Sequence, residues 1–258
     1  MKYALSTLMF KPQDLVKSVE FANELGIPLE IFPLWHDKFF AQFMKEHRED
    51  LCGIVCSFHE PYNFCEHSAP RGSVRYKEAM DTCHETFEYA AYLGASHVVF
   101  HHNNCAFSPA EKSDMIKHSA ENLCEMNEIA AEYKIPLLVE NAGVISLQNM
   151  LFDENEFIEL FTQIPNDCLI DIGHASCNGW NLERIISALG SKIKAYHAHN
   201  NDGNLDSHNR IGDGTLDIAE FKSLCEKFTP TAHIILEYVE GMDISAVECK
   251  EDISFFDL

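Results

Sequence analysis

The chain has 258 residues, and its 19 basic and 41 acidic side chains give a formal net charge of −22. This charge argues against nucleic-acid binding, because affinity for nucleic acid comes largely from Lys and Arg side chains that neutralise phosphates. No run of about 18 apolar residues occurs, so the sequence predicts no membrane span. We therefore expect a small-molecule partner.

The N-terminal segment and the cysteines both predict a cytoplasmic protein. The first apolar run is broken by Ser6 and Thr7, and no small-residue cleavage site follows it, so it is not typical of a secretory signal. The ten cysteines include no CxxC pair, and most lie inside apolar segments, where Cys behaves as a small hydrophobic residue. We expect neither a disulfide framework nor a zinc site built from thiolates.

Short apolar segments alternate with longer amphipathic ones along the chain. The apolar segments predict strands at residues 3–10, 27–33, 52–58, 95–101, 135–140, 167–172, 193–198 and 232–239. The amphipathic segments predict helices at 13–25, 37–50, 73–93, 111–133, 154–163, 181–189, 215–228 and 243–253. Strands that alternate with helices favour a parallel sheet, and eight is the number that closes a TIM barrel. We predict a single (β/α)8 domain over residues 1–258.

The longest irregular segments all follow predicted strands. They lie at residues 59–72, 101–110, 141–153 and 199–214. In a TIM barrel the loops after the strands build the active site at the carboxyl ends of the strands. The sequence therefore places a functional site on that rim.

Polar side chains stand at the ends of the predicted strands, where buried parallel strands are otherwise apolar. Taken singly, such residues are usually hydrogen-bonded or solvated, and the barrel prediction is what brings them to one rim. His102 and His199 lie one or two positions from this pattern, and we leave them outside the ligand set. The set comprises His59, His101, Glu140, Asp171, His174, His197, Asp206, His208 and Glu237.

Four carboxylates in one partly dry cavity would repel one another until some took up protons. Divalent cations remove this repulsion, and a mixture of His with Asp or Glu suits Zn, Mn, Fe or Co. We predict one to three divalent ions on the rim, with Zn or Mn as the expected metal.

The motifs FHEPYN, VFHHNN, VENAG, LIDIGHA, YHAHNND, DSHNRIGDGTLD and ILEY appear in this order. Together they resemble the xylose isomerase-like TIM-barrel superfamily, which includes sugar and sugar-phosphate isomerases and epimerases and the endonuclease IV group. The resemblance to endonuclease IV implies that all nine residues hold a three-metal cluster. The resemblance to the epimerases implies one metal, held by Glu140, Asp171, His197 and Glu237.

The epimerase resemblance implies that Glu140 and Glu237 act as the acid–base pair and that His174 contacts the substrate. The substrate would then be a sugar or a sugar phosphate, transformed through an enediolate. Further candidates for substrate contact are His59, His101, Trp35 and Arg210, with Arg71 and Arg75 as other loop cations for a phosphate. Trp35 could equally well be a packing residue, and the arginines could equally well be solvated loop residues without a role in binding.

Two other functions stay open at this point. The first is cleavage of DNA at abasic sites, which the complete ligand set favours and the negative charge opposes. In this chain His102 and Asn103 replace the Pro-Gly that endonuclease IV carries at that loop. The second is a barrel that binds metal or ligand without turnover. A homo-oligomer is possible, because the apolar stretch FEYAAYL at 87–93 fits either an interface or the inner face of a helix.

Overall fold

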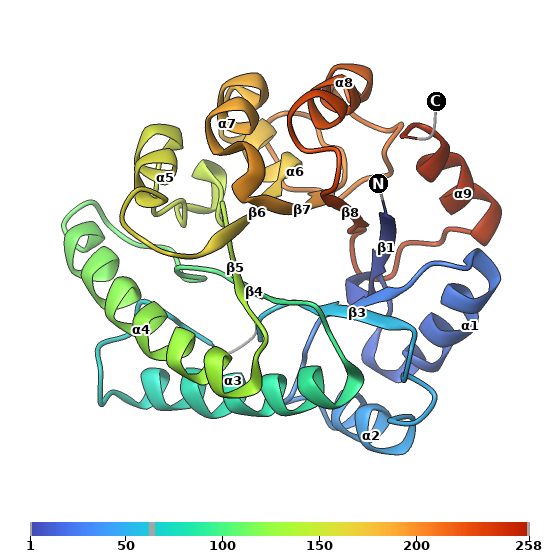
Figure 1. Ribbon diagram of the computed structural model, residues 1–258, viewed down its shortest axis with the longest axis horizontal. Coiled ribbons are helices and arrows are strands. Elements are labelled where there is room, and N and C mark those ends of the chain that lie inside the picture. The colour runs from blue at the N-terminus through green and yellow to red at the C-terminus, as the bar shows by residue number, and fades with distance from the viewer. Residues whose placement is uncertain (1, 62–64, 257–258) are drawn as a thin grey trace.

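The computed structural model describes residues 2–61 and 65–256. It contains a closed barrel in which β1 to β8 are hydrogen-bonded in chain order and all pairs are parallel (Figure 1). The predicted (β/α)8 fold is therefore confirmed. The strands are β1 (Lys2–Ser6), β2 (Leu29–Ile31), β3 (Val55–Phe58), β4 (Val98–Phe100), β5 (Leu137–Glu140), β6 (Asp167–Asp171), β7 (Ile193–Ala198) and β8 (His233–Leu236).

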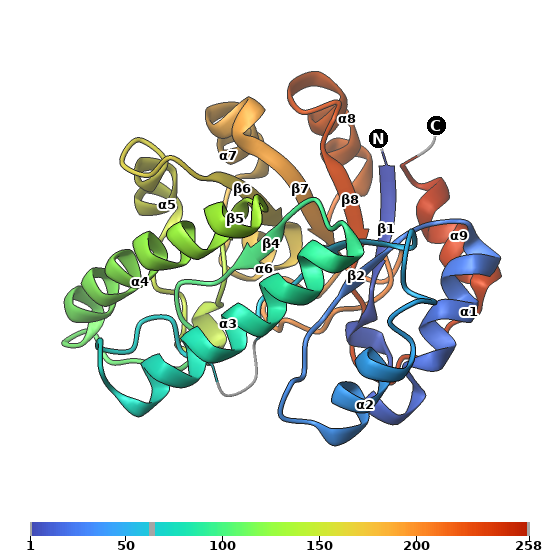
Figure 2. The ribbon, with the colours of Figure 1, turned by 60° about the horizontal axis from the view of Figure 1, so that its bottom comes forward.

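The helices surround the barrel and separate its strands along the chain (Figures 1 and 2). They are α1 (Val16–Leu25), α2 (Lys38–Glu46), α3 (Val74–Leu93), α4 (Lys112–Tyr133), α5 (Glu154–Leu160), α6 (Ile172–Cys177), α7 (Leu182–Leu189), α8 (Ile218–Phe228) and α9 (Ala246–Ser254). Every predicted helix is present with slightly different ends. The short α6 was not predicted; it starts directly at the end of β6, where the Asp171 side chain accepts a hydrogen bond from the His174 amide.

Residues in the left-handed conformation end three helices just before the next strand. Gly26 after α1 has φ +69° and Gly94 after α3 has φ +73°. Lys134 takes the same conformation after α4 with φ +60°, although it carries a Cβ. These sharp stops let each chain segment enter the barrel within a few residues.

The first strand is shorter than predicted. It ends at Ser6, and a 3-10 helix over Thr7–Met9 follows, with the Ser6 hydroxyl accepting a hydrogen bond from the Leu8 amide. The apolar run 3–10 thus serves two purposes. Its first half pairs in the barrel, and its second half turns over the barrel mouth and contributes to the cavity described below.

The barrel interior is layered. One small core cluster inside the barrel consists of Ala4, Val99, Leu138, Leu169, Ala195 and Ile235. Side chains two positions apart on a strand point to the same face, so the next layer is found by adding two to each number. That layer is polar: Ser6, His101, Glu140, Asp171, His197 and Glu237. The polar layer that contains the candidate ligands therefore lies directly next to an apolar layer of the barrel interior.

The composition also bears on the state of the cysteines and on membrane-spanning helices. All ten cysteines are free thiols in the structure. In residues 2–61 and 65–256, no helix is both long and apolar enough to span a bilayer. Tyr62 and Asn63 of the FHEPYN motif lie outside the described residues.

Candidate metal centre

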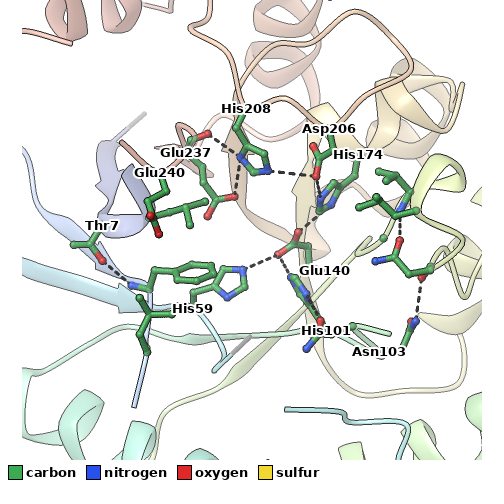
Figure 3. Close-up of a pocket in the computed structure, with 18 of the residues that line it drawn as sticks. Thr7, His59, His101, Asn103, Glu140, His174, Asp206, His208, Glu237 and Glu240 are labelled. Atoms are coloured by element: carbon green, nitrogen blue, oxygen red, sulfur yellow. Dashed lines mark hydrogen bonds and ion pairs between the residues drawn. The ribbon is translucent and has the colours of Figure 1, made fainter. Parts of the chain in front are cut away.

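The nine predicted ligands come together at the carboxyl ends of the strands. Figure 3 labels all of them except Asp171 and His197. Ligand atoms within 4.8 Å of one another form three overlapping groups that use only these residues: His59, His101 and Glu140; His59, His197 and Glu237; Glu140, Asp171 and His174. A fourth such group contains His174, Asp206 and His208. The arrangement has the donor types and the spacing that divalent metals require.

Glu140, the last residue of β5, lies among four histidines. Its Oε2 atom is 3.0 Å from Nε2 of His101, 3.3 Å from Nδ1 of His197 and 3.8 Å from Nε2 of His59. Its Oε1 atom is 3.2 Å from Nδ1 of His174. Glu140 is buried, so its charge depends on these neighbours rather than on water.

Asp206 and His208 lie closer to the mouth of the barrel, on the loop after β7. The Asp206 Oδ2 atom is 3.2 Å from Nε2 of His174 and 3.3 Å from Nε2 of His208. Nδ1 of His208 is 3.1 Å from the Glu237 carbonyl oxygen, which joins the loop to the end of β8. His208 has φ +47°, an uncommon conformation for a residue with a side chain. Its contacts on both ring nitrogens hold it there.

Several buried atoms face one another without hydrogen-bond geometry. Nδ1 of His174, Nδ1 of His197 and Oε1 of Glu140 are among the buried atoms that lack a hydrogen-bond partner within the described part of the chain. Buried polar atoms are nearly always hydrogen-bonded, so such a cluster requires an explanation. Ligand atoms that converge on a shared cation have this geometry, because their lone pairs point to a common centre rather than to each other. The residues therefore fit a metal ion.

In the metal-free protein, protonated histidines balance the negative charge of the carboxylates. Burial would lower the pKa of His101, but Glu140 and Glu60 raise it to about 9. Burial also opposes protonation of His208, yet Asp206 raises its pKa to about 9. Conversely, burial would raise the pKa of Glu140, and the neighbouring His101 and His197 hold it well below its ordinary value. Glu140 is thus ionised and available to bind a cation.

His199 belongs to the site, although the sequence analysis left it out. It is buried, its Nε2 lies 3.1 Å from Asp171 Oδ2, and its ring stacks on His208 at 3.8 Å between centroids. It also groups with His208 and Glu237 as possible ligands. The signal was present in the sequence, because His199 follows His197 by two positions and therefore faces the same side of the strand.

Two buried glutamates support the site and were also missed. Glu30 lies in β2, where its Oε1 is 2.7 Å from Nε2 of His197. Glu60, directly after His59, pairs with His67 and reaches 3.5 Å from Nδ1 of His101. A charged residue inside an apolar strand, as in PLEIF, is the sequence signal that could have identified Glu30.

The arginines and Trp35 are placed elsewhere. Arg210 turns away from the rim toward α9, where its guanidinium contacts Asp252 at 3.0 Å and Glu248 at 3.2 Å. The Trp35 indole donates a hydrogen bond to Thr86 and packs edge-on against Phe40. The prediction that Arg210 and Trp35 contact the substrate is therefore not supported. Arg210 pairs with carboxylates of α9, and Trp35 packs against the core.

The other two loop cations are also absent from the rim. Arg71 pairs with Glu125 at 2.7 Å, and Arg75 lies in the first turn of α3 and lines a separate surface groove beside α4.

A cavity of about 270 Å³ opens over the ligand cluster. Its polar side includes His59, His101, Glu140, His174, Asp206, His208, Glu237 and Glu240 (Figure 3). Its apolar side includes Leu8, Phe10, Leu15, Phe32, Leu34, Val144 and Leu147. Among the described residues that line it, none is Lys or Arg.

Comparison with known proteins agrees with this geometry. The family model described as a xylose isomerase-like TIM barrel matches residues 16–257. The chain belongs to this family. An uncharacterised protein of Methanocaldococcus jannaschii, MJ1311, is 26% identical over 269 aligned positions, which cover 97% of this chain and 87% of that protein. A second one from the same organism, MJ1614, is 25% identical over 197 positions, or 76% of each chain.

Solved structures of sugar epimerases share the fold of this family member. A D-tagatose 3-epimerase-like protein matches with a TM-score of 0.78 and 22% identity, covering 100% of this chain and 98% of that one. D-psicose 3-epimerase from Clostridium cellulolyticum H10 matches with a TM-score of 0.78 and 14% identity over the same shares. The IolI protein with a bound zinc atom matches with a TM-score of 0.79 and 18% identity, covering 100% of this chain and 95% of that one.

Proposed function

We propose that this protein is a divalent-metal-dependent isomerase or epimerase of a small sugar. The observation that carries the proposal is that two glutamates at the ends of different strands, Glu140 and Glu237, line one cavity over a cluster of ligand atoms without hydrogen-bond partners. The structural likeness to sugar epimerases supports it. The likeness to an IolI protein with a bound zinc atom supports the binding of a metal.

Glu140, Asp171 and Glu237, together with a histidine from the end of β7, are the residues that would hold the principal metal. Both His197 and His199 face these carboxylates, His197 through Nδ1 from the barrel interior and His199 through Nε2 from the mouth. A bound divalent metal would supply Lewis-acid polarisation of a carbonyl and its neighbouring hydroxyl. Zn and Mn are the metals we expect.

The chain's own contribution is proton transfer. Glu140 or Glu237 removes the proton on the carbon beside the carbonyl, and the other glutamate returns a proton to the resulting enediolate. His174 borders the same cavity and lies between Glu140 and Asp206, so it is positioned to contact a substrate oxygen.

The lining favours an uncharged sugar over a sugar phosphate. Phosphate groups are commonly bound by Lys or Arg, and the described cavity lining contains neither. Glu240 and Asp206 border the cavity near the mouth and would repel an anion. The apolar wall suits the carbon-rich face of a neutral sugar.

A deuterium-exchange screen tests this function. Protein loaded with Zn or Mn is incubated in heavy water with free ketoses and with their phosphates, and incorporation at carbon is followed by NMR. We expect exchange into a free ketose. Exchange only into phosphates would contradict the substrate class while leaving the reaction in place, and absence of exchange from loaded protein would contradict the reaction itself.

Cleavage of DNA at abasic sites is the second candidate, and one observation favours it. All nine ligands that endonuclease IV-like enzymes would use converge here, in groups that could hold more than one ion. The net charge of −22 and the absence of Lys and Arg from the described cavity lining oppose it. Nicking of an abasic duplex at low protein concentration would establish this function instead.

A further inference from the structure

A buried carboxylate lies beneath the proposed metal centre and is not part of the predicted ligand set. Glu30 in β2 is fully buried in the barrel. Its Oε2 accepts a hydrogen bond from the Ser57 hydroxyl at 2.8 Å and lies 3.9 Å from Nε2 of His97. Its Oε1 is 2.7 Å from Nε2 of His197. An ionised carboxylate in this position is costly unless it is paired and hydrogen-bonded, so the contact with His197 is essential to it.

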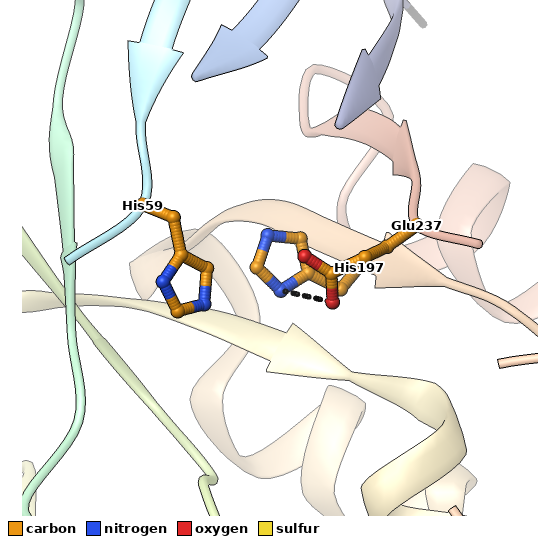
Figure 4. Close-up of side chains that lie close together, drawn as sticks. All are labelled: His59, His197 and Glu237. Carbon is orange, nitrogen blue, oxygen red and sulfur yellow. Dashed lines mark ion pairs between the residues drawn. The ribbon is translucent and has the colours of Figure 1, made fainter. Parts of the chain in front are cut away.

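The contact determines how His197 presents its second nitrogen. Because a carboxylate accepts, Nε2 of His197 carries the proton and donates it to Glu30. Nδ1 then faces away from Glu30, 3.3 Å from Glu140 and 3.6 Å from Glu237. Figure 4 shows His197 beside Glu237 and His59, with its Nδ1 on the Glu237 side. Nδ1 is also one of the buried atoms without a hydrogen-bond partner among the described residues.

We propose that Glu30 is a positioning residue, which holds the His197 ring from below through Nε2 so that Nδ1 points at the metal-binding carboxylates. Carboxylates that accept from the remote nitrogen of a metal-binding histidine fix its orientation and raise its basicity. This inference rests on the proposed metal centre. It adds a residue of β2 to a site whose other members come from other strands and the loops that follow them.

The fold explains why a glutamate can serve here. Glu30 pairs in register with Ser57 of β3, whose hydroxyl occupies the second carboxylate oxygen. Burial would raise the pKa of Glu30, but His197 together with His59 and His97 keeps it below its ordinary value. The carboxylate is therefore charged and locked between two strands, and it cannot rotate without breaking both hydrogen bonds.

Cobalt binding to three variants tests the proposal. Co²⁺ reports affinity by titration and ligand geometry by its visible absorption. We expect Glu30→Leu to lower Co²⁺ affinity by about 10- to 100-fold and to change the spectrum. Glu30→Gln should fall between it and wild type, because the amide oxygen still accepts from Nε2. Ser57→Ala should shift both readouts in the same direction by less.

Asp252→Asn is the matched control, because Asp252 is a buried carboxylate of α9 that pairs with Arg210 and accepts a hydrogen bond from Tyr238. It should lower thermal stability and leave the Co²⁺ spectrum unchanged. Folded Glu30→Leu protein with wild-type affinity and spectrum would overturn the inference. Wild-type protein that binds no Co²⁺ would instead overturn the metal centre itself.

Wild-type protein provides a second test that does not depend on the folding of a variant. In zinc-loaded protein with nitrogen-15-labelled histidine, the inference predicts a His197 signal with a proton retained on Nε2, absent from His197→Asn. A His197 ring protonated on Nδ1 in the loaded protein would overturn the inference.

Discussion

A methyl group at Gly173 would lie 1.9 Å from Cε1 of the His199 ring. Gly173, in the first turn of α6, therefore gives the imidazole the space that brings Nε2 to Asp171 and the ring face onto His208. We predict that Gly173→Ala displaces His199 and lowers zinc affinity at least about tenfold, a size typical of disturbed ligand support.

Gly212→Ala is the control for this substitution, because a Cβ there meets only Phe255 at an ordinary 3.5 Å. Zinc titration of both variants by competition with a chromophoric chelator makes the comparison. Equal affinities in Gly173→Ala and wild type would show that His199 does not contribute to metal binding.

Replacing either acid–base candidate should stop proton transfer more than metal binding. Gln keeps one oxygen donor in Glu140→Gln and Glu237→Gln but cannot exchange a proton. We expect each variant to lose about 10²- to 10⁴-fold in the rate of deuterium exchange into the sugar. Metal content, measured by mass spectrometry on the same samples, should stay near the wild-type value. Exchange at the wild-type rate in both variants would assign the proton transfer to other residues.

Metal affinity should increase with pH. The pKa values of His101 and His208 are both raised to about 9, since burial opposes protonation but neighbouring carboxylates favour it. At pH 7 both rings are protonated in the metal-free protein, and a metal ion must displace these protons. Calorimetry in buffers of different ionisation enthalpy should therefore detect proton release. Affinity should rise from pH 6 to pH 9 and then level off; an affinity independent of pH over this range would contradict the charge balance.

Arg210 should matter for stability and not for catalysis. Its guanidinium pairs with the buried Asp252, which also accepts a hydrogen bond from Tyr238. Arg210→Met leaves this carboxylate short of a partner, and we expect a loss of about 2–3 kcal/mol in unfolding free energy. Arg184→Met is the comparison, because that side chain is half exposed and its ion pair should contribute less than about 1 kcal/mol. An increased KM in Arg210→Met with unchanged stability would return Arg210 to the substrate site.

The sequence was sufficient to predict the barrel and the ligand layer. The alternation of apolar and amphipathic segments identified all eight strands, and polar residues at strand ends identified Glu140, Asp171 and Glu237. The structure explains the success: each of these residues stands two positions after a member of the apolar layer, such as Leu138, Leu169 and Ile235. A period of two is readable without coordinates.

Contacts between distant segments could not be predicted in this way. Glu30 and His197 are 167 positions apart, and only closure of the barrel brings their side chains together. Arg210 is a residue type that commonly binds phosphate. Its actual partner is Asp252, because the fold places α9 beside it. His199 stays outside the predicted ligand set because it lies one position beyond the end of β7, yet the closed barrel brings both His197 and His199 to the site.

The most direct test of the central claim is solvent deuterium incorporation by metal-loaded protein, followed in parallel with metal removal by a chelator. The claim is that this rim binds a divalent ion and transfers a proton at a sugar carbon. It predicts exchange into a neutral ketose that disappears on chelation and returns with added Zn or Mn. Loaded protein that exchanges no proton in any free or phosphorylated ketose would contradict it.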